Sequence, residues 1–241
     1  SKFLSKKKPL KIMESELQIR IENQKKISID KLKNILRFYK YEEYLRITVR
    51  DLAKICSFKE TLEELSNIAI CCLRIALRQI TLNELNSKKF FISKSISNTP
   101  KISIPKLNFK NDKKIKIIYP FTIIGLGKLG GFELNYSSDI DLIFVHDNEK
   151  ITGDKELDNQ IRMKVARVLI DTMSDITDEG FLARMDMRLR PGGDRSPLVQ
   201  SLDEMEIYYS TSREIWERQA LIKAVKIVGN SKCEENFFKM I

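Results

Sequence analysis

The sequence has few of the residues from which metal-binding, disulfide-linked and membrane-spanning proteins are built. Its 241 residues include one histidine, and its four cysteines form no Cys-x-x-Cys pair, so the common zinc motifs are missing. This cysteine usage favours a reducing compartment, and we expect a cytoplasmic location. No uninterrupted run of about 18 apolar residues occurs, and we therefore expect no membrane contact.

Negative charge is also in short supply, because 43 lysine and arginine residues face 33 aspartate and glutamate residues, a net charge of +10. Such a chain could bind nucleic acid. The lysines, however, are spread along the sequence, and aromatic residues are not interleaved with the basic clusters as stacking on bases requires. We therefore expect no nucleic-acid partner. The arginines gather at 184–195 and 213–218, and guanidinium forks match phosphate oxygens.

Four regions follow one another along the chain, and together they predict an α+β fold. Residues 1–85 carry apolar side chains at helical spacing. Residues 86–114 are rich in lysine, serine and asparagine, which indicates a flexible connection. Residues 115–200 contain period-two stretches typical of strands, and 201–241 return to a helical pattern. We place the domain boundaries at these positions.

Two aspartates stand two positions apart on a strand predicted over 138–146. Because side chains alternate between the two faces of a strand, Asp139 and Asp141 point the same way, while Ile140 and Leu142 point into the core. Neighbouring carboxylates repel each other, and a divalent cation removes that repulsion. Magnesium prefers oxygen ligands and is usually held by one or two carboxylates plus substrate phosphates. Taken alone, the pair fits a solvated acidic strand end better than a metal site.

A third aspartate strengthens the magnesium hypothesis. The sequence over 181–190 alternates, so one face of a predicted strand would carry Arg184, Asp186, Arg188 and Arg190 opposite a wholly apolar face. We predict that Asp186 is the third metal ligand and that the arginines bind phosphate. An ion-paired solvent face is the alternative.

A glycine-rich turn precedes the aspartate pair. Gly125, Gly127 and Gly130 imitate the Gly-x-Gly-x-x-Gly dinucleotide motif, but only residues 132–137 separate them from an acid-bearing strand. The long helix and second strand of a dinucleotide fold therefore have no room. We predict instead a turn whose backbone N–H groups approach a phosphate. Ser138 could bond a phosphate oxygen or simply cap the strand.

Three stretches together resemble one enzyme family. They are GLGKLGGFELNYSSDIDLIF at 125–144, RMDMRLRP at 184–191 and WERQALIKA at 216–224. They are similar to the signature of the bacterial bifunctional glutamine synthetase adenylyltransferase/deadenylylase. The form ELNYSSDID resembles the amino-terminal, deadenylylating unit of that family, whereas the adenylylating unit more often has GSDLD there. Ser196 departs from the family pattern, which usually has glycine at this position.

The resemblance implies a polymerase-β-like nucleotidyltransferase fold over 115–200, with a small mixed sheet flanked by helical regions. It implies an enzyme that regulates nitrogen assimilation by removing AMP from a tyrosine of glutamine synthetase with phosphate, giving ADP. The implied cofactor is Mg²⁺, and the implied partners are glutamine synthetase, an adenine nucleotide, phosphate and a nitrogen-signalling regulatory protein. The implied catalytic and metal-binding residues are Asp139, Asp141 and Asp186. The implied nucleotide- and phosphate-binding residues are Gly130, Gly131, Ser138, Arg188, Arg190 and Lys223.

Two other functions are compatible with the same residues. The first is adenylylation of glutamine synthetase with ATP, which would use the same metal ligands. The second is a non-catalytic module that docks on glutamine synthetase, and the three intact acids argue against it.

Overall fold

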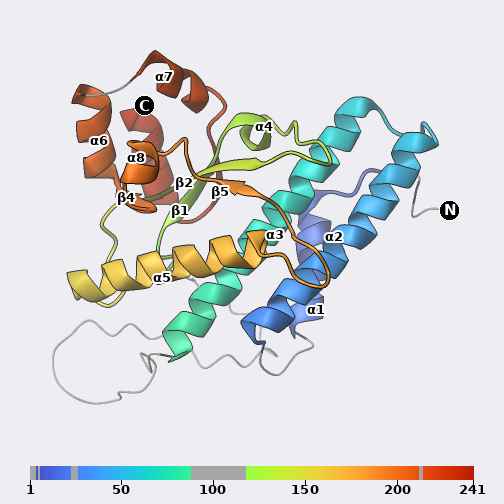
Figure 1. The fold of residues 1–241 in the computed structure, drawn as a ribbon, viewed down its shortest axis with the longest axis horizontal. Helices are drawn as coiled ribbons and strands as arrows, with labels where there is room; N and C mark the ends of the chain where they lie inside the picture. The colour runs from blue at the N-terminus through green and yellow to red at the C-terminus, as the bar shows by residue number, and fades with distance from the viewer. Residues whose placement is uncertain (1–3, 5, 23–26, 88–117, 212–213) are drawn as a thin grey trace.

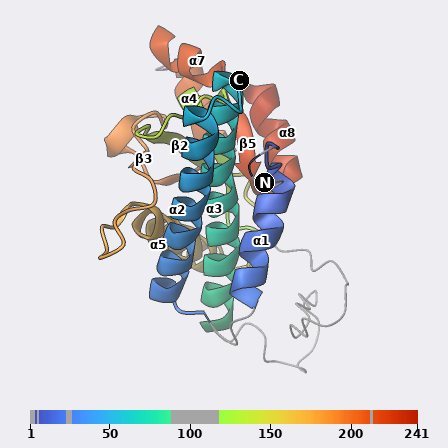
Figure 2. The ribbon, with the colours of Figure 1, turned by 90° about the vertical axis from the view of Figure 1, so that its right-hand side faces the viewer.

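The computed structural model describes residues 4, 6–22, 27–87, 118–211 and 214–241. Helices and a small mixed sheet make up this part of the chain, which confirms the α+β prediction. Three long helices run side by side on one flank of the molecule, and the sheet lies next to them (Figure 1, Figure 2). The connection predicted over 86–114 falls outside the described residues, apart from its first two positions, which complete the third helix.

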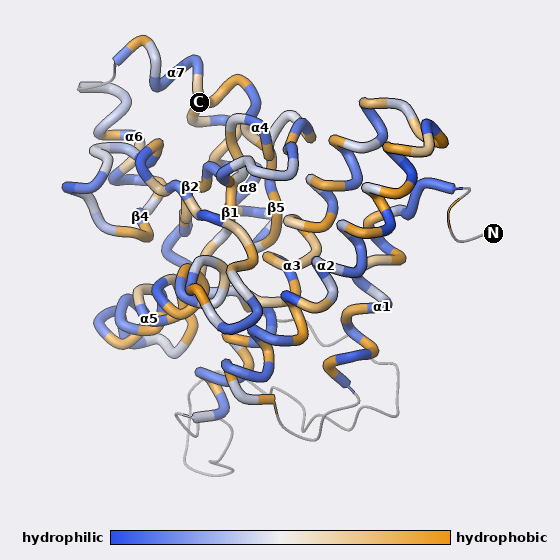
Figure 3. The backbone as a smooth tube through the Cα atoms, turned by 45° about the vertical axis from the view of Figure 1, so that its right-hand side comes forward, coloured by the Kyte–Doolittle hydropathy of each residue, from blue (hydrophilic) through white to orange (hydrophobic). Residues whose placement is uncertain are grey.

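The first region is helical, as predicted, and consists of α1 (Leu10–Glu22), α2 (Ile29–Leu52) and α3 (Phe58–Ser87). Ser28 caps α2 by accepting a hydrogen bond from the backbone N–H of Lys31. At the start of α3, the Ser57 Oγ accepts from the Glu60 N–H, and the Glu60 carboxylate accepts from the Ser57 N–H. This reciprocal capping box satisfies two N–H groups that a helix start leaves unpaired. Hydrophilic and hydrophobic residues alternate around these helices, as on amphipathic helices (Figure 3).

The helix α3 is the centre of the molecule. Both α1 and α2 pack against it, and so does α5 (Lys155–Ser174) from the other region. On length and composition α3 could cross a membrane, although Arg74 and Arg78 interrupt its apolar residues, so the expectation that no uninterrupted apolar run of about 18 residues occurs is not contradicted. In the structure 72% of its most apolar stretch is buried. Its apolar character is accounted for by contact with these three helices.

Five short strands form the sheet: β1 (Thr122–Gly125), β2 (Ile140–His146), β3 (Met185–Asp186), β4 (Val199–Ser201) and β5 (Val225–Val228). The strand β1 lies between β2 and β5 and is antiparallel to both. Both β3 and β4 run parallel to β2, β3 beside its beginning and β4 beside its end. The sheet is therefore mixed, as expected.

Each face of the sheet is covered by helices. Ile140, Leu142 and Phe144 of β2 are buried in a cluster that includes residues of α3 and α5, which confirms that they point into the core. Ile143 and Val145 on the other face are buried against α6 (Leu202–Thr211) and α8 (Ser231–Met240). Two further helices, α4 (Gly127–Gly130) and α7 (Ile215–Leu221), lie near the end of the sheet where β2 begins (Figure 1). Asp141 belongs to the second face, at the end where α4 packs against β2.

Three sequence-based boundaries need correction. The strand predicted over 181–190 is real only at Met185–Asp186, because the chain then enters turns and a short 3₁₀ helix at Gly193–Arg195. The strand predicted from residue 115 is observed only at Thr122–Gly125, its first three positions lying outside the described residues. The segment 201–241 is not purely helical, because β5 joins the sheet through β1.

Candidate active site

Three aspartates come together at the end of the sheet where β2 begins. Asp139 immediately precedes β2, Asp141 lies in β2, and Asp186 lies in β3. Asp141 and Asp186 are register partners on adjacent parallel strands, so their side chains are on the same face. Burial raises the pKa of Asp141, and the negative charges of Asp186 and Asp139 raise it further. The three carboxylates are therefore close enough to repel one another.

Two arginines pair with these acids. The Arg184 Nε donates to Asp139 Oδ1 at 2.5 Å, and its Nη2 donates to the Ser137 carbonyl at 2.9 Å. Arg188 donates hydrogen bonds to the Asp186 carboxylate through Nε and Nη2, the latter at 2.6 Å, and its backbone N–H also donates to that carboxylate. These hydrogen bonds lower the pKa of Asp186. The side chains of Arg184 and Arg188 are 60% and 74% exposed, so both are open to a ligand.

The residue types of this site fit magnesium, although their arrangement does not yet form a coordination shell. Within the described residues no three acidic, histidine or cysteine side chains stand together in position to hold a metal ion, because Asp139 and Asp186 are turned toward arginines. All three donors are oxygens, the kind that magnesium prefers. Burial, and then the charges of Asp186 and Asp139, raise the pKa of Asp141, and a bound divalent cation would favour its charged form. Binding of the metal would require Arg184 and Arg188 to release their partners.

The glycine-rich turn lies against the acids, but two of its glycines have a structural role. At Gly127, with φ +51°, a Cβ would stand 2.3 Å from Asp141 Oδ2, so only glycine leaves room for that carboxylate. At Gly130 a Cβ would stand 1.9 Å from the Lys223 carbonyl oxygen. The N–H groups of Gly130 and Gly131 donate to the carbonyls of Leu126 and Gly127. These two N–H groups are therefore occupied within the turn, and a role of the turn in binding phosphate stays a sequence-based prediction.

The other residues predicted to bind phosphate already have hydrogen-bond or ion-pair partners within the chain. Ser138 follows the loop before β2, and its hydroxyl donates to Asn135 Oδ1 at 2.9 Å. Lys223 is half-exposed and pairs with Glu133 at 2.6 Å. Arg190 is 5% exposed, and it donates to the Met187 carbonyl at 2.6 Å and to the Ser196 carbonyl at 3.2 Å. Arg190 thus holds the turn after β3, and a role in binding phosphate remains a sequence-based prediction that these contacts do not favour.

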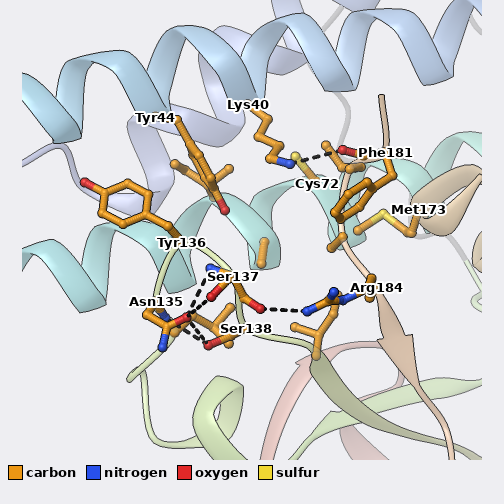
Figure 4. A pocket seen from close by; sticks show the side chains of 16 residues that line it. Lys40, Tyr44, Cys72, Asn135, Tyr136, Ser137, Ser138, Met173, Phe181 and Arg184 are labelled. Atoms are coloured by element: carbon orange, nitrogen blue, oxygen red, sulfur yellow. Dashed lines mark hydrogen bonds between the residues drawn. The ribbon is translucent and has the colours of Figure 1, made fainter. Parts of the chain in front are cut away.

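A second hollow, the aromatic pocket, opens beside the acids and was not foreseen from the sequence. It is lined by α2, α3, the end of α5, the loop before β2 and the segment before β3 (Figure 4). Lys40 and Tyr44 of α2 point into it from one side, Tyr136 and Phe181 approach from its flanks, and Arg184 forms its border toward the acids. Arg184 also lines the shallow cleft that contains Asp139 and Asp186. The spacing of Lys40 and Tyr44, four residues apart on one helix face, was the signal available in the sequence.

The sequence of this chain is similar to that of one family of known proteins. The family described as glutamate-ammonia ligase adenylyltransferase matches residues 1–240. The chain belongs to this family. Three curated relatives carry the name bifunctional glutamine synthetase adenylyltransferase/adenylyl-removing enzyme. The protein of Nitrosococcus oceani is 37% identical over 86% of this chain and 20% of its own length. That of Pseudomonas aeruginosa is 34% identical over 95% and 22%. That of Haemophilus ducreyi is 47% identical over 49% and 13%. The chain thus spans about a fifth of the length of the first two relatives.

Proposed function

We propose that this chain is a nucleotidyltransferase unit that removes AMP from an adenylylated tyrosine of glutamine synthetase by phosphorolysis. The observation that carries the proposal is the meeting of three carboxylates and two exposed arginines at one end of the sheet. Both activities in the names of these relatives, adenylyl transfer and adenylyl removal, act at the α-phosphorus of an adenylyl group. A polymerase-β-like fold, a cytoplasmic setting and glutamine synthetase as the protein partner are parts of the same proposal.

Asp139, Asp141 and Asp186 would hold magnesium in this function. When bound, the metal would neutralise charge on the phosphate oxygens and orient the reacting groups. Arg184 and Arg188, once released from the acids, would bind the phosphate oxygens through their guanidinium forks. Their positive charge offsets the repulsion between the incoming phosphate and the AMP phosphodiester.

The reaction conserves atoms and charge without any other reactant. An oxygen of hydrogen phosphate forms a bond to the α-phosphorus, and the bond from that phosphorus to the tyrosine oxygen breaks. The proton of hydrogen phosphate passes to the tyrosine oxygen, so the products are ADP and an unmodified tyrosine. The removal direction is favoured by the ELNYSSDID form of the site and by the two exposed arginines beside it, because removal brings a free phosphate anion against the AMP phosphodiester, which is already negatively charged.

A paired assay on one preparation tests the proposal. The chain is incubated with adenylylated glutamine synthetase, Mg²⁺ and phosphate, and ADP is measured. In parallel it is incubated with unmodified glutamine synthetase, Mg²⁺ and radiolabelled ATP. We expect phosphate-dependent ADP release and little incorporation of label. Incorporation of label without ADP release would instead assign the adenylylating direction. If neither activity is observed, the non-catalytic docking module is the remaining interpretation.

A further inference from the structure

The aromatic pocket borders the acid site around the start of β2, although Ile140 in its wall belongs to the sheet face opposite that of Asp139 and Asp141. Arg184 lines both the pocket and the cleft of the acids. Ser138 lines the pocket and the next residue, Asp139, lines the cleft, and neighbouring Cα atoms are only about 3.8 Å apart. A ligand with its phosphate at the aspartates therefore has this pocket as the adjacent space for its remaining part.

The lining of the pocket suits a flat aromatic ring. Most of its walls are apolar side chains from α3, α5 and the two loop segments, and three aromatic rings stand among them. The rings of Tyr44 and Tyr136 meet edge to face with centroids 5.6 Å apart, and the Thr48 hydroxyl holds the Tyr136 hydroxyl at 3.2 Å. The volume is about 140 Å³. Since an apolar cavity of about 150 Å³ holds a benzene ring, the pocket has room for one ring system that protrudes toward the opening, but not for a whole nucleotide.

One positive group stands at the edge of this apolar space. The Lys40 Nζ donates to the Phe181 carbonyl at 3.0 Å and lies 5.1 Å from the Tyr44 centroid and 5.0 Å from the Phe181 centroid. Burial lowers its pKa. An ammonium group has three donors, so Lys40 can also donate to an acceptor nitrogen on the edge of a ring in the pocket.

We propose that the aromatic pocket binds the adenine base of the nucleotide, with its ring beside Tyr44, Tyr136 and Phe181 and a ring nitrogen accepting from Lys40. This inference rests on the proposed function, since it assumes that the phosphates occupy the acid site. The other ring in the reaction is the phenol of the target tyrosine. Adenine is favoured over the phenol because the pocket extends down to the buried Ile68 and Cys72 of the central helix. A free nucleotide can enter to that depth by itself, whereas a tyrosine would have to be carried in by a loop of the partner protein.

The test compares the binding of ADP with that of pyrophosphate, which has no base, by calorimetry in the presence of Mg²⁺. Ala69 lines the pocket on α3, and Ala69→Met fills it with a residue that helices tolerate well. We expect the Kd for ADP to rise about tenfold, the scale of one base-stacking contact, and the Kd for pyrophosphate to stay unchanged. Ala53→Met, an exposed position after α2, is the matched control and should change neither Kd.

A second variant keeps the test decisive if Ala69→Met folds poorly. Lys40→Met retains the length of the side chain and removes its donors, and we expect a several-fold weaker ADP affinity with unchanged pyrophosphate affinity. ADP affinities equal to those of the wild type in either folded variant would overturn the inference, as would a wild type that binds pyrophosphate but not ADP. Unchanged ADP binding together with a raised KM for adenylylated glutamine synthetase would assign the pocket to the tyrosine ring. The proposed function fails separately, if the wild type shows no transfer in either direction.

Discussion

Two of the regions in which opposite charges meet make a clear contrast, and only one of them looks like a site. In the helical region, Glu64 of α3 pairs with Arg46 at 2.5 Å and also with Arg50, and Glu43 pairs with Arg46 at 2.9 Å. The four side chains are at most 4% exposed. Lys8, ahead of α1, extends the network by pairing with Glu43 and with Glu16, so that three acids face three cations. The four buried charges cross-link α2 and α3 and have no access to a ligand.

At the end of the sheet the same kinds of residue meet under different conditions. Arg184 and Arg188 each hold one aspartate, yet both guanidinium groups are mainly in solvent. Asp141, beside the two pairs, forms no salt bridge among the described residues, and its pKa is raised by burial and by the two neighbouring carboxylates although Arg188 and Lys128 oppose the shift. A buried balanced network stabilises one arrangement, whereas an exposed unbalanced one can exchange its partners for a ligand. Burial and charge balance, rather than the presence of ion pairs, distinguish the two regions.

The largest expected effect is the loss of activity at the unbalanced cluster. Asp141→Asn should lower the turnover of adenylylated glutamine synthetase by on the order of 10³-fold, because it removes the carboxylate placed between the other two acids. ADP release at saturating Mg²⁺ is the measurement. Asp171→Asn, an exposed acid on α5, is the control. Equal turnover in both variants would contradict a metal-holding role.

The balanced network should respond in stability instead. Glu64→Gln leaves Arg46 and Arg50 buried without their shared carboxylate, and removal of one partner from a buried pair typically costs about 3–5 kcal/mol. Urea denaturation followed by circular dichroism measures this change. Asp186→Asn, whose partner Arg188 is exposed, should change the unfolding free energy little. Similar losses in the two variants would erase the distinction between the regions.

The far end of β2 offers a third kind of charge environment. His146 is 7% exposed, its Nδ1 accepts from the Asn148 N–H at 3.1 Å, and burial and Arg162 lower its pKa to about 4. Since the unfolded chain takes up this proton near pH 6.5, the contribution of His146 is complete above that pH and is lost as the pH falls toward 4. The difference corresponds to about 3 kcal/mol.

His146→Gln should remove this part of the pH dependence while keeping an acceptor for Asn148. The measurement is the unfolding free energy between pH 7 and pH 4, with the wild type and the variant compared at each pH. Relative to the variant, the wild type should lose stability as the pH falls from 7 to 4. Parallel curves would show that His146 takes up its proton equally in the folded and unfolded chains.

The smallest effect concerns Asp141 again, now in stability. Because its pKa is raised in the folded chain, its negative charge opposes folding above that pKa. Asp141→Asn should therefore raise Tm at pH 7 slightly, because it removes a charge whose burial is unfavourable. The gain should shrink as the pH falls toward 3.8, the ordinary pKa. A lower Tm at pH 7 would mean that the carboxylate is stabilised by contacts that its raised pKa does not reflect.

Much of the local structure could be predicted from the sequence. The helical spacing of 1–85, the capping box at Ser57 and the buried face of β2 all follow from short-range patterns, and the structure confirms them. The alternation over 181–190 was more deceptive. It placed Arg190 on the face of Asp186, but Gly192 and Gly193, with φ values of +74° and +55°, turn the chain, and Arg190 is buried beneath that turn. A period-two pattern reports alternating polarity, and a strand also needs a neighbour to supply hydrogen bonds.

The sequence by itself determined the chemistry of the site and part of its geometry. Two aspartates two positions apart on a strand must share a face, and Asp139 and Asp141 flank the buried Ile140 as that rule requires. Only the tertiary structure decided that Asp186 lies beside Asp141, that β5 completes the sheet and that the aromatic pocket forms between α2 and the loop before β2. These pairings join segments far apart in the chain. Which distant segments meet depends on how all the apolar faces are buried together around α3, and no local pattern contains that information.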